Sequence, residues 1–132
     1  MTAISVFDKN MEIIGKRYPD LAKRISGTKD NPSCKLIQSS NGKPNVLIKK
    51  GSDFYILYDN NDPATYCDSY LEKLDLKYAP VVVFMGLGLG YHLDRYFKIL
   101  GEKVGTRQVV VFEKDIELFR LALSVGDFAQ VI

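Results

Sequence analysis

The sequence predicts an α/β protein: a small α+β N-terminal part, with helices and a three-stranded antiparallel meander, followed by the first half of a Rossmann-like parallel sheet. Three observations predict this: helical spacing near the start, short β-prone segments in the middle, and apolar strands that alternate with helices after Pro80. Wholly apolar strands separated by helices are typical of a parallel sheet. We therefore assign residues 1–62 to the first part and residues 63–132 to the second.

The first part begins with helical periodicity. Apolar side chains recur at intervals of three and four residues at Phe7, Met11, Ile14 and Tyr18. This spacing predicts a helix from about Ser5 to Gly15 with one buried stripe. Pro19 interrupts that helix, and because proline suits the first turn of a helix we expect a short second helix to begin there.

The pattern then changes to short segments separated by turn residues. The expected strands are Lys35–Gln38, Asn45–Lys49 and Phe54–Tyr58. Asn41-Gly42 and Gly51-Ser52-Asp53 lie between them, which predicts an antiparallel meander. Asp62 and Pro63 form a typical helix start, so a helix over residues 63–76 should follow.

The second part repeats a strand and a helix. The expected elements are a strand at Val81–Met85, a helix at Tyr91–Leu100, a strand at Val109–Phe112 and a helix at Ile116–Leu123. One such β-α-β-α unit cannot close a parallel sheet, so we expect the chain to be a segment of a larger protein. An incomplete sheet exposes an edge, which makes a homo-oligomer a reasonable expectation.

The motif that suggests chemistry is a glycine loop between a strand and a helix. Gly86, Gly88 and Gly90 follow the apolar strand, and Glu113 ends the next strand. Glycines permit positive φ and a close approach of backbone amides to a ligand, and an acid at that strand end can accept hydrogen bonds from a ribose. These four residues are the candidate nucleoside site, with a nucleotide sugar donor or S-adenosylmethionine as ligand.

Besides a nucleotide sugar site, two other interpretations of this loop stay open. The spacing is closer to that of S-adenosylmethionine-dependent methyltransferases than to the dinucleotide fingerprint, because Tyr91 occupies the sixth position. Phe84 stands where those methyltransferases usually carry an acid. Alternatively, the glycines only make a tight turn in a structural module and Glu113 is a solvated strand end.

Polar residues near the loop have simpler interpretations. His92 is the only histidine; a general base is conceivable, but a helix-surface or capping role is favoured. Asp94 and Arg95 are expected to be solvated. Asp115 is expected to cap the last helix.

Composition excludes several classes of protein. The formal net charge is only +2 and no run of like charge exceeds two residues, so no nucleic-acid partner is expected. The longest apolar run is too short for a membrane span, and the acidic and basic residues near the start argue against a signal peptide. Cys34 and Cys67 stand alone without metal-ligand spacing, which indicates reduced thiols in a cytoplasmic protein and no metal site.

Four stretches of the chain resemble the N-terminal region of the bacterial motility-associated factor family. They are Asn10–Leu21, the pair Tyr58-Asp59 before Asp62-Pro63, Gly86–Leu93 and Phe112–Phe119. The glycine-tyrosine-histidine sequence at Gly90-Tyr91-His92 is the most specific of them. The resemblance covers most of the chain.

The resemblance implies a role in glycosylation. Proteins of this family are linked to transfer of a nonulosonic acid, such as pseudaminic or legionaminic acid, from a nucleotide-activated donor to Ser or Thr of flagellin. Their central region is similar to an archaeal pterin pyrophosphokinase. The catalytic part is expected downstream of this chain, so the segment alone is not expected to be catalytic. Because flagellin is the acceptor, it is an expected partner.

Overall fold

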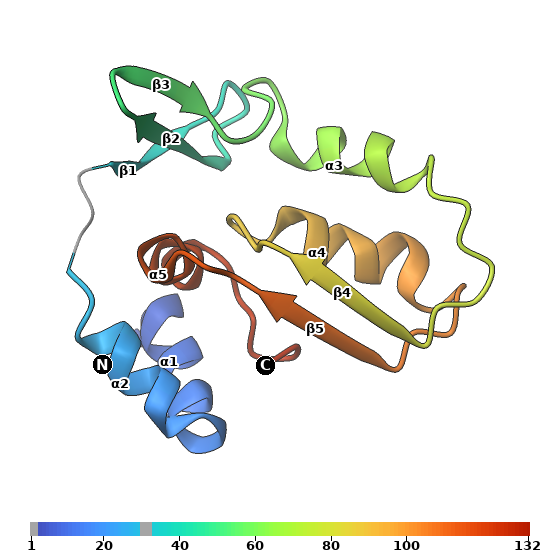
Figure 1. Ribbon diagram of the computed structural model, residues 1–132, viewed down its shortest axis with the longest axis horizontal. Helices are drawn as coiled ribbons and strands as arrows, with labels where there is room; N and C mark the ends of the chain where they lie inside the picture. The colour runs from blue at the N-terminus through green and yellow to red at the C-terminus, as the bar shows by residue number, and fades with distance from the viewer. Residues whose placement is uncertain (1–2, 30–32) are drawn as a thin grey trace.

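The computed structural model describes residues 3–29 and 33–132 and places a helical pair, a meander and a small parallel sheet around shared apolar cores (Figure 1). In chain order the helices and strands are α1 (Val6–Arg17), α2 (Pro19–Ser26), β1 (Cys34–Gln38), β2 (Pro44–Lys50), β3 (Asp53–Ile56), α3 (Pro63–Leu71), β4 (Val81–Met85), α4 (Tyr91–Tyr96), the π-helical turn η1 (Phe97–Gly101), β5 (Gln108–Phe112) and α5 (Ile116–Val125). This order confirms the predicted fold class.

The two N-terminal helices form as the periodicity predicts. The Ser5 hydroxyl caps α1 by accepting a hydrogen bond from the Asp8 amide at 3.1 Å, and Pro19 occupies the first turn of α2. Ile14 and Ile25 are fully buried, one from each helix. Both helices contact α5, so the N-terminal pair lies against the last helix of the chain.

A buried asparagine joins α1 to the C-terminal segment. The Asn10 side chain is 0% exposed, and its Nδ2 donates to the carbonyls of Leu123 at 2.9 Å and Gly126 at 2.7 Å. Its Oδ1 accepts a hydrogen bond from the Phe128 amide at 3.0 Å. Every polar atom of this amide is thereby used, as burial requires.

The meander is confirmed, with strand order β1-β2-β3 and antiparallel pairing throughout. Val46 of β2 reaches the main core, whereas all four residues of β3 are exposed. Asn45 joins the meander to the chain that follows it, because its Oδ1 accepts from the Tyr58 amide at 3.2 Å and its Nδ2 donates to the Tyr58 carbonyl at 3.1 Å. Tyr58 thus lies beyond the strand that was expected to contain it.

Helix α3 is shorter than expected. Asp62 caps it through hydrogen bonds from the Ala64 and Thr65 amides, but the helix ends at Leu71 and not near residue 76. The Leu74 amide donates instead to the Leu71 carbonyl at 3.1 Å, in a tight turn. That turn lets Leu74 pack against the cluster of Leu71, Tyr96 and Val104. Tertiary packing therefore overrides the helical spacing.

Strands β4 and β5 form a two-stranded parallel sheet in which Val81 pairs with Gln108 and Met85 with Phe112. The helix predicted for residues 91–100 is present as α4 followed by η1. The main core takes side chains from both predicted parts, including Ile14 and Val46 from the first and Leu93 and Leu123 from the second. A division near residue 62 remains a prediction.

Candidate functional site

The predicted glycine loop lies at the carboxyl end of β4 and leads directly into α4 (Figure 1). Gly86, Gly88 and Gly90 all have positive φ, at 105°, 59° and 90°. L-residues with a side chain adopt this region at a cost, so the backbone itself accounts for glycine at these three positions.

The amides of the loop donate to partners within the chain. Gly86 N donates to the Phe112 carbonyl at 2.6 Å and Gly90 N to the Leu87 carbonyl at 3.0 Å. Leu89 N donates to the Tyr58 hydroxyl at 2.8 Å. The two remaining amides, of Leu87 and Gly88, donate to Glu113. A phosphate bound by this loop would have to displace one of these partners.

Glu113 holds the loop in place. Its Oε2 accepts from Leu87 N at 2.9 Å and from Gly88 N at 3.4 Å, and its Oε1 accepts from Asp115 N at 3.0 Å. The carboxylate expected to accept hydrogen bonds from a ribose therefore lies beside the glycine loop, as predicted, but bonds to the backbone. Asp115 occupies the N-cap position of α5 without a side-chain capping bond, so the expected cap is not formed.

This arrangement predicts a stability role for Glu113. Glu113→Ala should lower the free energy of unfolding by about 1–3 kcal/mol, because three amides lose their acceptor. Urea denaturation measures this, with Glu102→Ala, an exposed glutamate, as the matched control. Equal stability of the two variants would contradict the role.

Side chains of the protein fill the space beside two of the glycines. A Cβ on Gly88 would lie 2.1 Å from the Tyr58 hydroxyl, and one on Gly90 would lie 2.5 Å from the Phe128 ring. Tyr58 and Phe128 are both buried, and burial raises the pKa of Tyr58 to about 12. A Cβ on Gly86 would meet nothing within 4 Å. The missing side chains at Gly88 and Gly90 thus make room for Tyr58 and Phe128 of the same chain.

His92 lies among aromatic rings. Its ring centroid is 6.0 Å from that of Tyr58 and 5.9 Å from that of Tyr70, and its burial lowers its pKa from 6.5. The expected helix-surface role is therefore only partly right, because the imidazole is partly buried. A lowered pKa means that the folded state prefers the neutral ring.

A pH dependence follows for this chain with one histidine. As the pH falls below about 6.5, the unfolded chain binds the proton more readily than the folded chain, so the free energy of unfolding falls. His92→Gln should reduce this decrease between about pH 7 and 5. Urea denaturation across that range measures it, and an unchanged pH profile would contradict the inferred role.

A groove adjoins the loop at Gly90 and Tyr91. It has a cavity volume of about 770 Å³ and runs between α1, the α4–η1 helix and the C-terminal segment 125–131. Its apolar wall is formed by Leu93, Phe97, Val125, Phe128 and Val131. Phe97 is 40% exposed and Val131 47% exposed, so part of this apolar wall is open to solvent.

Charged side chains along the groove form ion pairs. Lys9 Nζ lies 2.6 Å from Asp127 Oδ2, and Lys98 Nζ lies 2.9 Å from Asp94 Oδ2. The Asp94 side chain is solvated, as expected, and pairs with Lys98. The Arg95 side chain is less solvated than expected. These pairs reduce the positive charge available to an anionic ligand.

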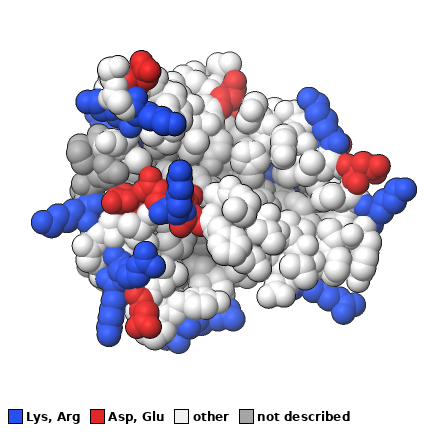
Figure 2. All heavy atoms as spheres, viewed as in Figure 1, with Lys and Arg blue, Asp and Glu red and all other residues white. Residues whose placement is uncertain are grey.

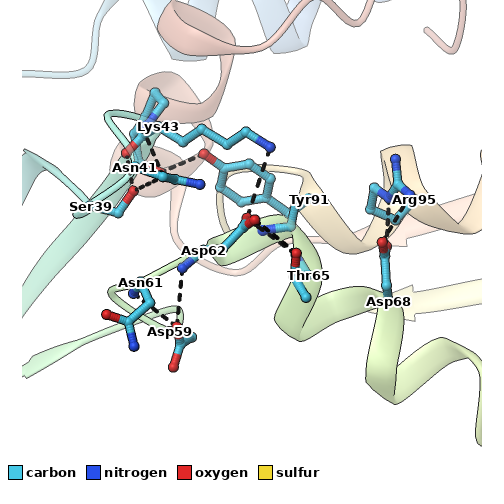
Figure 3. Close-up of polar contacts among 12 residues, drawn as sticks. Ser39, Asn41, Lys43, Asp59, Asn61, Asp62, Thr65, Asp68, Tyr91 and Arg95 are labelled. Atoms are coloured by element: carbon cyan, nitrogen blue, oxygen red, sulfur yellow. Dashed lines mark hydrogen bonds and ion pairs between the residues drawn. The ribbon is translucent and has the colours of Figure 1, made fainter.

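Figure 3 shows polar contacts that include three lining residues of the groove, Lys43, Tyr91 and Arg95. Arg95 forms a bidentate pair with Asp68 of α3, at 2.5 Å and 2.9 Å, and both side chains are partly buried. Lys43 Nζ lies 3.9 Å from Asp62 Oδ1, and the Tyr91 hydroxyl donates to the Pro44 carbonyl at 2.6 Å. The Arg95–Asp68 pair joins α4 to α3, and the contacts of Lys43 and Tyr91 connect these helices to the meander.

Across residues 3–29 and 33–132, no three His, Cys, Asp or Glu side chains gather closely enough to hold a metal ion. None of the helices in the same ranges has both the length and the apolar character that a membrane crossing needs. Cys34 and Cys67 are free thiols, and burial raises the pKa of Cys67 to about 11.

Sequence reasoning missed the residues that close the loop. Tyr58 was expected only as the last residue of a strand, with no role at the loop, and Phe128 was not singled out. Both contact glycines far from them in the sequence, so no local spacing indicated them. The only available signal for Tyr58 was its place in a stretch that supports the family resemblance.

The comparison with protein families identifies the chain. A model described as the glycosyltransferase Maf N-terminal domain matches residues 6–77 and 69–132. No curated protein and no solved structure matched the chain. The two matched segments together cover nearly all of it, so the chain belongs to the Maf glycosyltransferase N-terminal domain family.

Proposed function

We propose that this chain is the acceptor-interaction region of a cytoplasmic glycosyltransferase that transfers a nonulosonic acid from a nucleotide-activated donor to Ser or Thr of flagellin. The transfer chemistry belongs to a catalytic part downstream, and this region binds flagellin. Membership of the Maf family supports the glycosyltransferase setting. The hydrogen bonds within the glycine loop favour an interaction role over donor binding.

The observation that carries this choice is the internal pairing of the loop amides. Leu87 N and Gly88 N donate to Glu113, and Leu89 N donates to Tyr58. Binding a diphosphate or a ribose there would break contacts that hold the loop together. The expected nucleoside site formed by the glycines and Glu113 is therefore the weaker proposal.

The groove beside the loop has the character of a polypeptide site. Its wall is apolar, with Phe97 and Val131 partly exposed, and its charged side chains are paired. A peptide segment buries apolar side chains and satisfies polar groups at the rim. A nucleotide sugar would favour a site with unneutralised cations.

Calorimetric titration of the chain with monomeric flagellin tests this proposal. We expect saturable binding of flagellin, and at least a tenfold loss of affinity for Val131→Asp, which places a charge on the apolar wall. Phe54→Asp, on the exposed strand β3 outside the groove, is the matched control and should bind normally.

Separate titrations distinguish the other candidate functions. Saturable binding of a cytidine nucleotide without binding of flagellin would favour donor recognition. Binding of S-adenosylmethionine would favour the methyltransferase alternative. Absence of flagellin binding in a folded sample would contradict the proposal.

A further inference from the structure

Among the described residues, no helix or strand packs on one face of the β4–β5 sheet. The parallel register places Val81, Val83 and Met85 on the same face as Gln108, Val110 and Phe112. Of these, Val81 is 54% exposed, Val83 50%, Met85 82% and Phe112 58%. We call these six residues the open sheet face.

The opposite face of the same sheet is covered. Val82 and Phe84 of β4 pack against the cluster that contains Leu71 and Tyr96, and Val109 and Val111 of β5 pack against the main core. In Figure 1 no helix crosses in front of the two strands, and Figure 2 shows that the surface over them is nearly free of charged side chains. A parallel sheet is normally covered on both faces, so this exposure requires a partner.

The chemistry of the open sheet face narrows the class of partner. Five of its six side chains are apolar and the sixth is the neutral Gln108. Interfaces without charge at their centre are typical of permanent contacts, such as those between parts of one protein. A nucleic acid or a charged ligand finds no complementary group here.

The size of the face argues against a second copy as the occupant. A standard stable complex buries about 800 Å² on each partner, from roughly 20–30 residues a side. Six side chains on two short strands supply only a small part of that surface. Contacts between parts of one polypeptide do not need this area, because the linkage raises their effective concentration.

We propose that the open sheet face is the docking surface for the part of the Maf glycosyltransferase that follows this N-terminal domain, and that an apolar helix face of that part covers it. The family description as an N-terminal domain supports the existence of such a part. Met85 directly precedes Gly86, so the docked helix would also lie beside the glycine loop. The inference does not depend on flagellin binding in the groove.

Thiol labelling tests this proposal without relying on enzymatic activity. Met85→Cys is made in a Cys34→Ser background, where Cys67 remains fully buried. Its rate of reaction with a maleimide is compared between the 132-residue chain and the full-length glycosyltransferase. Phe54→Cys, at a residue that is 60% exposed on β3, is the matched control.

We expect labelling at Met85 to be at least tenfold slower in the full-length protein, with less than a twofold change at Phe54. Val81→Cys gives the same comparison should the Met85 variant not fold. Protection at Met85 no greater than at Phe54 would overturn the proposal. So would concentration-dependent protection in the 132-residue chain together with a dimer in sedimentation, because a second copy would then be the occupant.

Discussion

Gly88→Ala is expected to lower the free energy of unfolding by about 2–5 kcal/mol, because it adds a steric clash to an unfavourable backbone conformation. The new Cβ would lie 2.1 Å from the Tyr58 hydroxyl at a φ of 59°. That hydroxyl is fixed by the Leu89 amide and is buried, so it has little freedom to move. Urea denaturation followed by circular dichroism measures the loss.

A second substitution separates the clash from the backbone strain. Tyr58→Phe removes the oxygen that the Cβ would meet. Gly88→Ala should therefore lower the free energy of unfolding less in that background than in the natural sequence. Gly86→Ala is the control for strain alone, since its Cβ would meet no atom within 4 Å. An equal loss in the free energy of unfolding on Gly88→Ala in the two backgrounds would contradict the inference that the Tyr58 hydroxyl fills the space beside Gly88.

Asn10→Leu is expected to lower the free energy of unfolding by about 3–5 kcal/mol, because it leaves two carbonyls and one amide without partners inside the protein. The carbonyls are those of Leu123 and Gly126, and the amide is that of Phe128. The matched control is Asn61→Leu at an exposed position. Urea denaturation of both variants measures the difference.

This substitution should also affect the loop. Phe128 is the side chain that packs beside Gly90, so releasing its segment loosens one wall of the glycine loop. We expect faster proteolysis of the C-terminal segment in Asn10→Leu than in Asn61→Leu. A loss within about 1 kcal/mol of the control would show that Asn10 does not join α1 to that segment.

Local patterns predicted most of the fold. Apolar side chains at three- and four-residue spacing located α1, and unbroken runs of valine located β4 and β5. Turn residues at Asn41-Gly42 separated β1 from β2 correctly. These signals work because each reflects contacts within one element or between neighbouring elements.

Features that depend on distant contacts were not predictable in this way. The end of α3 at Leu71 is set by packing against the cluster near β4, which no spacing within the helix reports. The sequence grouped Gly88 and Glu113 as a candidate ligand site, which stays a prediction, and it did not indicate that the two residues bond to each other. A glycine loop has the same sequence pattern whether a ligand or a tyrosine fills the space beside it.

The protein's own groups close the glycine loop. Amide hydrogen exchange at Leu87, Gly88 and Leu89, measured by NMR with and without a cytidine nucleotide, tests this closure most directly. We predict slow exchange of all three amides in the free chain and no change with nucleotide. Fast exchange in the free chain that slows when nucleotide is added would contradict the claim and identify the loop as a ligand site.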